Sequence, residues 1–245
     1  MRKALLVAAF SAISAVALSQ DKVEDRLYYL DISVGYNFAL PPFTSSGNSV
    51  TMLKPHNGGS MSFSFARKVG DDWGVQIEVL SAAFKVNSSD LQNFFTDSKP
   101  SQVNLNGYNS TFFGVGAVKF FPFGKFKLDL KGSAGMNMTE FAKQEYLLQV
   151  KAFNPSSPTF ENITINAKRG YAPALLLGTR LRYPIGETID LGIKVEYGLS
   201  KVSFDIEKTA RAQDQPKAEP TYSDLGSHSK TISYINTGFT LGLRF

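Results

Sequence analysis

The chain has 245 residues, a net charge of +5 and no cysteine. The charge is weak and no run of Lys or Arg forms a basic footprint, which excludes nucleic acid as a partner. Without cysteine the protein has no disulfides and no site for N-terminal lipidation, and without His or Cys clusters at ligand spacing we expect neither metal nor cofactor.

The N-terminus has the pattern of a secretory signal peptide. Arg2 and Lys3 precede an uncharged apolar run over residues 4–17, which is too short to cross a bilayer. Small residues near its end suit signal peptidase. We therefore expect a signal peptide over residues 1–19, with cleavage within 17–20.

The rest of the chain, residues 20–245, is predicted to form a single domain. Apolar and polar residues alternate there in stretches typical of β-strands, and no apolar window is long enough for a transmembrane helix. The eight expected strands lie at residues 27–40, 58–69, 73–86, 108–121, 125–139, 171–183, 188–204 and 229–245. Each is long enough to cross a bilayer at a tilt, which takes about 9–11 residues.

The connections between these strands alternate strictly between short and long. Three short ones, rich in Gly, Pro and Asp, lie at residues 70–72, 122–124 and 184–187. Four long ones lie at residues 41–57, 87–107, 140–170 and 205–228. This order is typical of a membrane barrel with short periplasmic turns and long external loops. The sequence thus predicts an all-β, eight-stranded antiparallel up-and-down transmembrane β-barrel with both termini in the periplasm.

The two faces of the expected strands differ in chemistry. One face is Ile, Leu, Val and aromatic, and we expect it to contact lipid. The other mixes Gly, Ser and both signs of charge, and we expect it to fill a narrow lumen in which opposite charges pair and glycines leave room. The predicted lumen charge network comprises Asp31, Glu78, Lys127, Asp129, Lys131, Arg180, Arg182, Lys194, Glu196 and Arg244. The alternative is a solvated face on a soluble barrel.

Two local features qualify this pattern. In the fourth strand Gly114 and Gly116 favour one inward face, but Phe120 falls on the same face, so its orientation stays open. Aromatic residues gather near strand ends, as in the girdle of a membrane barrel. They are Tyr28, Tyr29, Trp73, Phe120, Phe121, Phe123, Tyr183 and Phe245.

The last strand places four apolar residues on one face and ends on an aromatic residue. These residues are Phe239, Leu241, Leu243 and Phe245. They resemble the C-terminal signature by which the barrel-assembly machinery recognises outer-membrane barrels. With the signal peptide and the strand pattern, residues 20–245 resemble the small porin-like barrels of the OmpA/OmpX type. The resemblance implies the outer membrane of a Gram-negative envelope, contact with its lipid, and the assembly machinery as a partner during biogenesis.

The long loops hold the only candidate chemistry. His228, between Ser227 and Ser229 and near Asp224 or Glu219, is the sole arrangement that could supply a nucleophile and a base. We expect an ordinary loop histidine instead, as for His56, and no catalytic residue. Two further expectations concern loop structure. An apolar stretch over residues 146–153 could form a hairpin that continues the barrel wall, which we favour, or binds a partner, and residues 210–220 are expected to be flexible.

We therefore expect a non-enzymatic outer-membrane barrel that serves envelope integrity or surface interaction through its long loops. An extracellular or envelope protein is the candidate partner. The alternatives are a narrow channel for ions or small solutes, a lipid-modifying enzyme, and an accessory barrel of a secretion complex.

Overall fold

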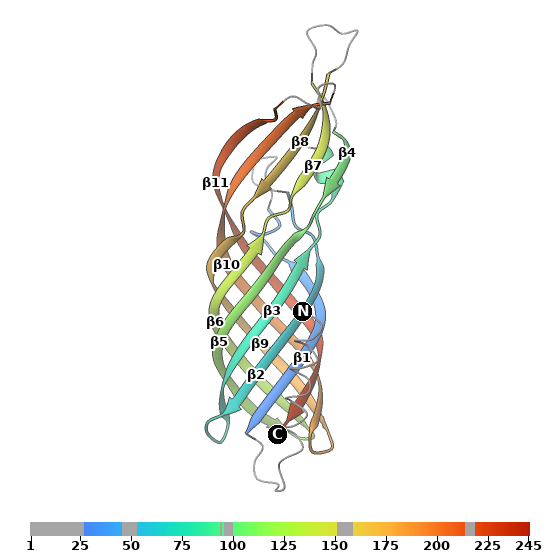
Figure 1. Ribbon diagram of the computed structural model, residues 1–245. Helices are drawn as coiled ribbons and strands as arrows, with labels where there is room; N and C mark the ends of the chain where they lie inside the picture. The colour runs from blue at the N-terminus through green and yellow to red at the C-terminus, as the bar shows by residue number, and fades with distance from the viewer. Residues whose placement is uncertain (1–26, 46–52, 94, 96–99, 151–158, 214–218) are drawn as a thin grey trace, which may run out of the picture.

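The computed structural model describes residues 27–45, 53–93, 95, 100–150, 159–213 and 219–245. The predicted signal peptide and its cleavage point lie outside these residues. Antiparallel strands make up almost all of the described chain (Figure 1). Within the described residues, no helix combines the length and the apolar character that crossing a membrane requires.

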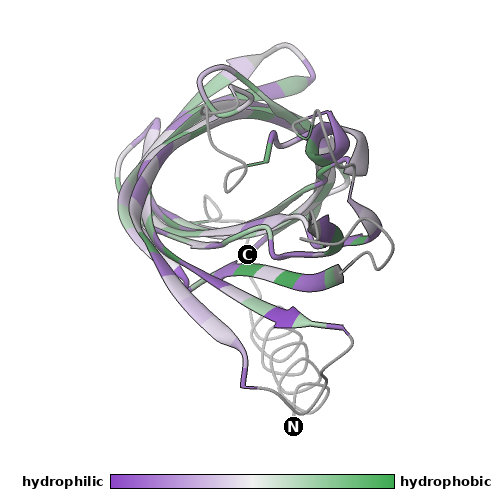
Figure 2. Ribbon diagram, turned by 90° about the horizontal axis from the view of Figure 1, so that it is seen from above, coloured by the Kyte–Doolittle hydropathy of each residue, from purple (hydrophilic) through white to green (hydrophobic). Residues whose placement is uncertain are grey.

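Eight strands close into a ring, which confirms the predicted fold class. They are β1 (Tyr28–Ala39), β2 (Gly58–Lys68), β3 (Trp73–Phe84), β5 (Tyr108–Phe123), β6 (Phe126–Glu140), β9 (Gly170–Ile185), β10 (Ile189–Ala212) and β11 (Thr221–Arg244). Each pairs with the next in this order, and β11 returns to pair with β1 from Tyr29↔Arg244 to Ala39↔Tyr234. Seen from above, the strands surround a central lumen (Figure 2).

The three predicted short turns lie together at one end of the ring. Gly124 and Gly186 take positive φ values of 61° and 65° in two of them, a conformation that glycine adopts without steric cost. The first and last strands close at this end too, where the Tyr28 N–H donates to the Phe245 carbonyl over 2.9 Å. We call it the turn end, and the opposite end the loop end.

The outer surface of the ring is apolar. Along β10 six outward side chains are between 37% and 53% exposed, namely Ile189, Leu191, Ile193, Val195, Tyr197 and Leu199. The inward residues Asp190, Lys194 and Glu196 are at most 3% exposed. A soluble protein has the reverse arrangement, whereas a barrel with lipid outside and polar groups inside is built this way.

The fourth strand of the ring, β5, follows the same alternation. Phe113 and Val115 face outward and are 49% and 66% exposed, whereas Phe112 and Phe120 face inward and are 2% and 9% exposed. The orientation that the sequence left open is therefore settled: Phe120 shares the inward face with the two glycines.

The aromatic girdle was predicted correctly in part. Trp73 and Tyr183 are 50% and 45% exposed at the turn end, but Tyr29 and Phe120 are buried inside the lumen with ring centroids 5.0 Å apart. The guanidinium of Arg182 lies over both rings, 4.7 Å and 5.5 Å from their centroids. Near a strand end adjacent residues are both aromatic, so composition alone does not show which of the two points inward. The Phe123 side chain lies outside the described part.

Beyond Leu199 the polarity of β10 reverses. Lys201 and Ser203 are exposed on the outer face, whereas Val202, Phe204 and Ile206 on the inner face are at most 1% exposed. From this level upward the strand packs as it would in a water-soluble protein.

Three further strands continue the wall here. They are β8 (Thr159–Ala167), which pairs with β10, β7 (Gln144–Val150), which pairs with β8, and β4 (Ser101–Leu105), which pairs with β7. These pairings confirm the hairpin that continues the barrel wall, and Phe153 of the predicted stretch lies outside the described residues. We call the five strands β11-β10-β8-β7-β4 above the ring the external sheet.

The expected loop over residues 205–228 was largely wrong. β10 runs on to Ala212 and β11 begins at Thr221, because the alternation continues with its apolar face turned inward. Residues 210–212, expected to be flexible, are strand, and residues 214–218 of that segment lie outside the description. The expected loop over 87–107 contains a short helix, α2 (Ser88–Gln92), and β4.

An apolar core closes the lumen at the loop end. Phe43 and Leu53, from the first long loop, are 0% and 5% exposed within it. The Phe43 ring packs 5.0 Å from Phe84 and 5.7 Å from Tyr108. The Leu53 carbonyl accepts hydrogen bonds from the Tyr108 hydroxyl over 3.1 Å and from the Lys230 Nζ over 3.3 Å. We call this core the loop-end plug.

Candidate functional site

The lumen between the turn end and the loop-end plug holds the predicted charges in two clusters. The first is centred on Asp129 of β6. Its carboxylate accepts from Arg180 Nε over 2.8 Å and from Arg182 Nη2 over 2.7 Å. Arg180 also pairs with Asp31 across the lumen, and Arg182 Nη1 lies 2.9 Å from Asp190 Oδ2. We call this group, which Arg244 completes, the Asp–Arg cluster.

The second cluster lies one layer closer to the plug. Lys131 Nζ is 2.6 Å from Glu78 Oε1 and also pairs with Glu196. Lys194 Nζ lies 2.7 Å from Glu196 Oε2 and 2.6 Å from the Ser62 hydroxyl. These four charged side chains are at most 3% exposed. We call them the Lys–Glu cluster.

Each cluster is electrically balanced. The Asp–Arg cluster has three aspartates and three arginines, and the Lys–Glu cluster has two glutamates and two lysines. Balance matters because a charge without a partner inside a protein is costly, whereas a paired and hydrogen-bonded one is tolerated. The two clusters themselves therefore add no net charge to the lumen.

A layer of amides and hydroxyls separates the charges from the plug. The Asn137 amide donates to Ser200 Oγ over 2.7 Å, and its carbonyl oxygen accepts from Ser110 Oγ over 2.7 Å. The Asn236 amide donates to Asn37 Oδ1 over 2.8 Å. Neutral hydrogen bonds thus occupy the level between the ion pairs and the apolar plug.

Gly178 gives the Lys–Glu cluster its room. It pairs with Lys131 on one side and with Glu196 on the other. A Cβ at this position would lie 2.7 Å from Glu196 Cγ and 2.7 Å from the Val195 carbonyl oxygen, closer than real Cβ atoms approach. The absence of a side chain therefore lets the lysine and the glutamate meet.

Nine of the ten predicted lumen residues enter buried ion pairs in the structure. The tenth, Lys127, is half-buried near the turn end and takes part in none of the ion pairs among the described residues. Sequence reasoning missed Asp190, which is 1% exposed and pairs with Arg182 and Arg244. It could have been found by extending the inward face of β10 one step below Gly192.

The candidate catalytic group of the loops is not brought together. The His228 ring lies 2.9 Å from the Leu225 carbonyl oxygen. The Asp224 carboxylate accepts from the Gly226 N–H over 2.8 Å, and Ser229 Oγ bonds to Ser203 Oγ over 2.9 Å. The second histidine, His56, pairs with Asp90 over 2.9 Å. In the part of the chain that the structure describes, no three potential ligands are grouped to hold a metal.

The four residues of the C-terminal signature face outward. Phe239 and Leu241 are 74% and 50% exposed, and Leu243 and Phe245 are partly exposed. The Phe245 ring stacks on Tyr28 with centroids 5.8 Å apart. The signature thus lies on the last strand at the seam where the ring closes.

Comparison with known proteins supports the fold. No family model matches the chain, and no curated protein matches it. Among solved structures, a major outer membrane protein from Thermus thermophilus matches with a TM-score of 0.50 and 11% identity, over 89% of this chain and 99% of that one. Neisserial surface protein A gives 0.48 and 10%, over 89% and 97%. The outer membrane protein OprG from Pseudomonas aeruginosa gives 0.47 and 14%, over 92% and 99%. The chain has the fold of a small outer-membrane β-barrel.

Proposed function

We propose that the protein is a non-enzymatic barrel of the outer membrane that holds the external sheet in the water outside the bilayer, for envelope integrity or for contact with a partner. The reversal of polarity along β10 carries this proposal. The outward residues are apolar up to Leu199 and polar from Lys201 onward, so one strand leaves a lipid environment and enters an aqueous one. The likeness of the fold to outer-membrane proteins supports the same location.

The filled lumen favours an anchor over a narrow channel. Two balanced charge clusters, an amide layer and the loop-end plug follow one another between the two ends of the ring. An eight-stranded ring has an interior that side chains can fill. Steady ion flow would require both the buried ion pairs and the plug residues Phe43 and Leu53 to move.

The contacts of His228 favour a non-enzymatic role. A general base must lie within hydrogen-bond reach of the group that it deprotonates, and this ring is bonded to a backbone carbonyl instead. The Asp224 carboxylate accepts a hydrogen bond from the Gly226 N–H instead. The external loops therefore serve better as a binding surface than as a hydrolase site.

The absence of cysteine from the chain allows a direct test. Ser227 lies exposed on the external sheet, and Asp71 lies exposed in the β2–β3 turn. Ser227→Cys should react with a membrane-impermeant maleimide on intact cells, and Asp71→Cys only after the outer membrane is permeabilised. Labelling of Asp71→Cys alone on intact cells would reverse the orientation, and equal labelling of both would oppose a membrane-spanning barrel.

The partner and the route of assembly are also part of the proposal. The outward C-terminal signature supports recognition by the barrel-assembly machinery, and the external sheet supports contact with an extracellular or envelope protein. Cross-linking from Ser227→Cys on intact cells should capture such a protein, whereas Asp71→Cys should not capture it.

A further inference from the structure

Two positively charged side chains face outward at the turn end of the ring, and each lies over at least one aromatic ring. Lys119 Nζ is 5.0 Å from the centroid of Trp73 and 5.1 Å from that of Phe121. The guanidinium of Arg67 is 5.7 Å from the centroid of Tyr28. Rings in this position hold a cation by electrostatic attraction and limit the directions that its flexible side chain can take.

The two cations flank the same strand. Arg67 of β2 pairs with Val75 of β3, and Lys119 of β5 pairs with Trp73 of β3. They are therefore two strands apart, a lateral separation of roughly 10 Å. The Arg67 guanidinium lies over Tyr28 of β1, and Lys119 Nζ lies over Trp73 of β3, so each cation faces its own position on the outer surface.

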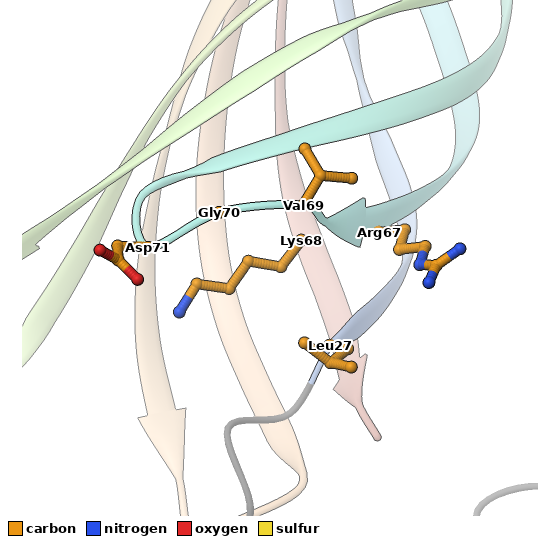
Figure 3. A pocket seen from close by; sticks show the side chains of 6 residues that line it. All are labelled: Leu27, Arg67, Lys68, Val69, Gly70 and Asp71. Atoms are coloured by element: carbon orange, nitrogen blue, oxygen red, sulfur yellow. The ribbon is translucent and has the colours of Figure 1, made fainter.

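This pair of cations has no carboxylate partner among the residues that the structure describes. The nearby Asp71 is in the turn beyond the strand ends, where it and Arg67 both line a surface hollow. Figure 3 shows Lys68 extending toward Asp71, whereas Arg67 points away from both. The charge of Arg67 is thus directed to the outer face of the barrel.

The depth of the site identifies what meets these charges. Val75 and Ile77, the next outward residues of β3, are both 53% exposed and begin the apolar belt. Trp73, at the border of this belt, is in the position where indole rings lie at headgroup level. Lysine and arginine at this level extend their charged ends toward the headgroups, where the available anion is the lipid phosphate.

We propose that Arg67 and Lys119, on the two sides of Trp73, each bind the phosphate of an anionic phospholipid in the leaflet at the turn end. This inference rests on the proposed membrane location. A basic residue near an anionic membrane surface contributes enough to change lipid affinity about fivefold. Wild-type protein should therefore prefer an anionic over a zwitterionic phospholipid, and each cation should contribute to that preference.

Trp73 is the only tryptophan in the chain, so its fluorescence reports on this site. The folded protein is placed in vesicles of phosphatidylglycerol and phosphatidylcholine, with one lipid brominated near the headgroup end of its chains. A second set of vesicles carries the bromine on the other lipid at the same mole fraction. Brominated phosphatidylglycerol should quench Trp73 more strongly, and the difference should shrink at high salt.

Three variants test the residues. Arg67→Gln and Lys119→Gln should each reduce the preference about fivefold, and the double variant should abolish it. Lys201→Gln removes an exposed outward charge at the opposite border and should leave the preference unchanged. The heat-dependent gel shift verifies that each variant is folded, and the ratio between the two brominated lipids corrects for any direct effect on the indole.

The outcomes separate this inference from the proposed function. Equal quenching by both lipids in the wild type, or an equal loss in Lys201→Gln, would overturn the phosphate site and leave the membrane barrel intact. Quenching by neither lipid would overturn the membrane location itself. Loss of the preference when sodium phosphate replaces sodium chloride at constant ionic strength would point to free phosphate and overturn lipid docking.

Discussion

Replacing Lys131 with methionine should strongly destabilise the ring. Lys131 Nζ lies 2.6 Å from Glu78 Oε1 and also pairs with Glu196, and the three side chains are at most 3% exposed. Methionine keeps much of the length but removes the charge, so two buried carboxylates face each other without this cation. Breaking a buried ion pair from one side costs about 3–5 kcal/mol. Lys201→Met, at an exposed outward position, should change stability by less than about 0.5 kcal/mol.

Urea unfolding in vesicles, followed by Trp73 fluorescence and by the unboiled gel band, measures these changes. The double variant Lys131→Met/Glu78→Gln removes one charge of each sign and leaves Glu196 paired with Lys194. Its destabilisation should be smaller than the sum of the single variants by about 0.5–3 kcal/mol, as for other residues in one ion-pair network. If the destabilisation of the double variant equals the sum of the two single variants to within about 0.5 kcal/mol, the buried pair is refuted.

Three further changes test other parts of the structure. Gly178→Val should destabilise the ring by at least about 1–3 kcal/mol by displacing Glu196, whereas Gly59→Val, whose Cβ would meet nothing within 4 Å, should be tolerated; equal urea midpoints would contradict the close approach. Phe245→Ala should lower the yield of folded barrel in cells relative to total protein, and an unchanged ratio would oppose a role of this residue in assembly. Burial raises the pKa of Tyr146 to about 12, so the external sheet should lose stability as pH rises from about 10, the usual phenol value, toward 12. The tyrosinate absorbance that the wild type shows and Tyr146→Phe lacks should appear with a midpoint near pH 12. A midpoint near pH 10 would show that the ring is exposed.

The ring could be predicted from the sequence because its signal is repeated and local. Along β10 the outward residues from Ile189 to Leu199 alternate strictly with inward polar ones, and lipid outside makes the contrast strong. The alternation of short turns and long loops then fixed the direction of every strand. The lumen charges followed from the same face assignment.

The external sheet was harder to predict because the solvent outside it changes. Once β10 leaves the apolar belt, its apolar residues Val202, Phe204 and Ile206 face inward. The apolar face of the strand therefore changes from the outer side to the inner side. Pairing between β8 and β10 depends on contacts distant in sequence, which alternation does not encode. The contribution of Phe43 and Leu53 to the plug is likewise tertiary, because nothing in the pattern of the first long loop shows which of its apolar residues turn into the barrel.

Electrical recording in planar bilayers tests the central claim, a membrane barrel closed by its own side chains. The protein is inserted after its heat-dependent gel shift has verified folding, and voltage of both signs is applied. The filled lumen predicts a silent membrane, with no steady conductance steps above the protein-free baseline. Long-lived unitary steps from the wild-type protein would contradict the account and would favour the narrow channel.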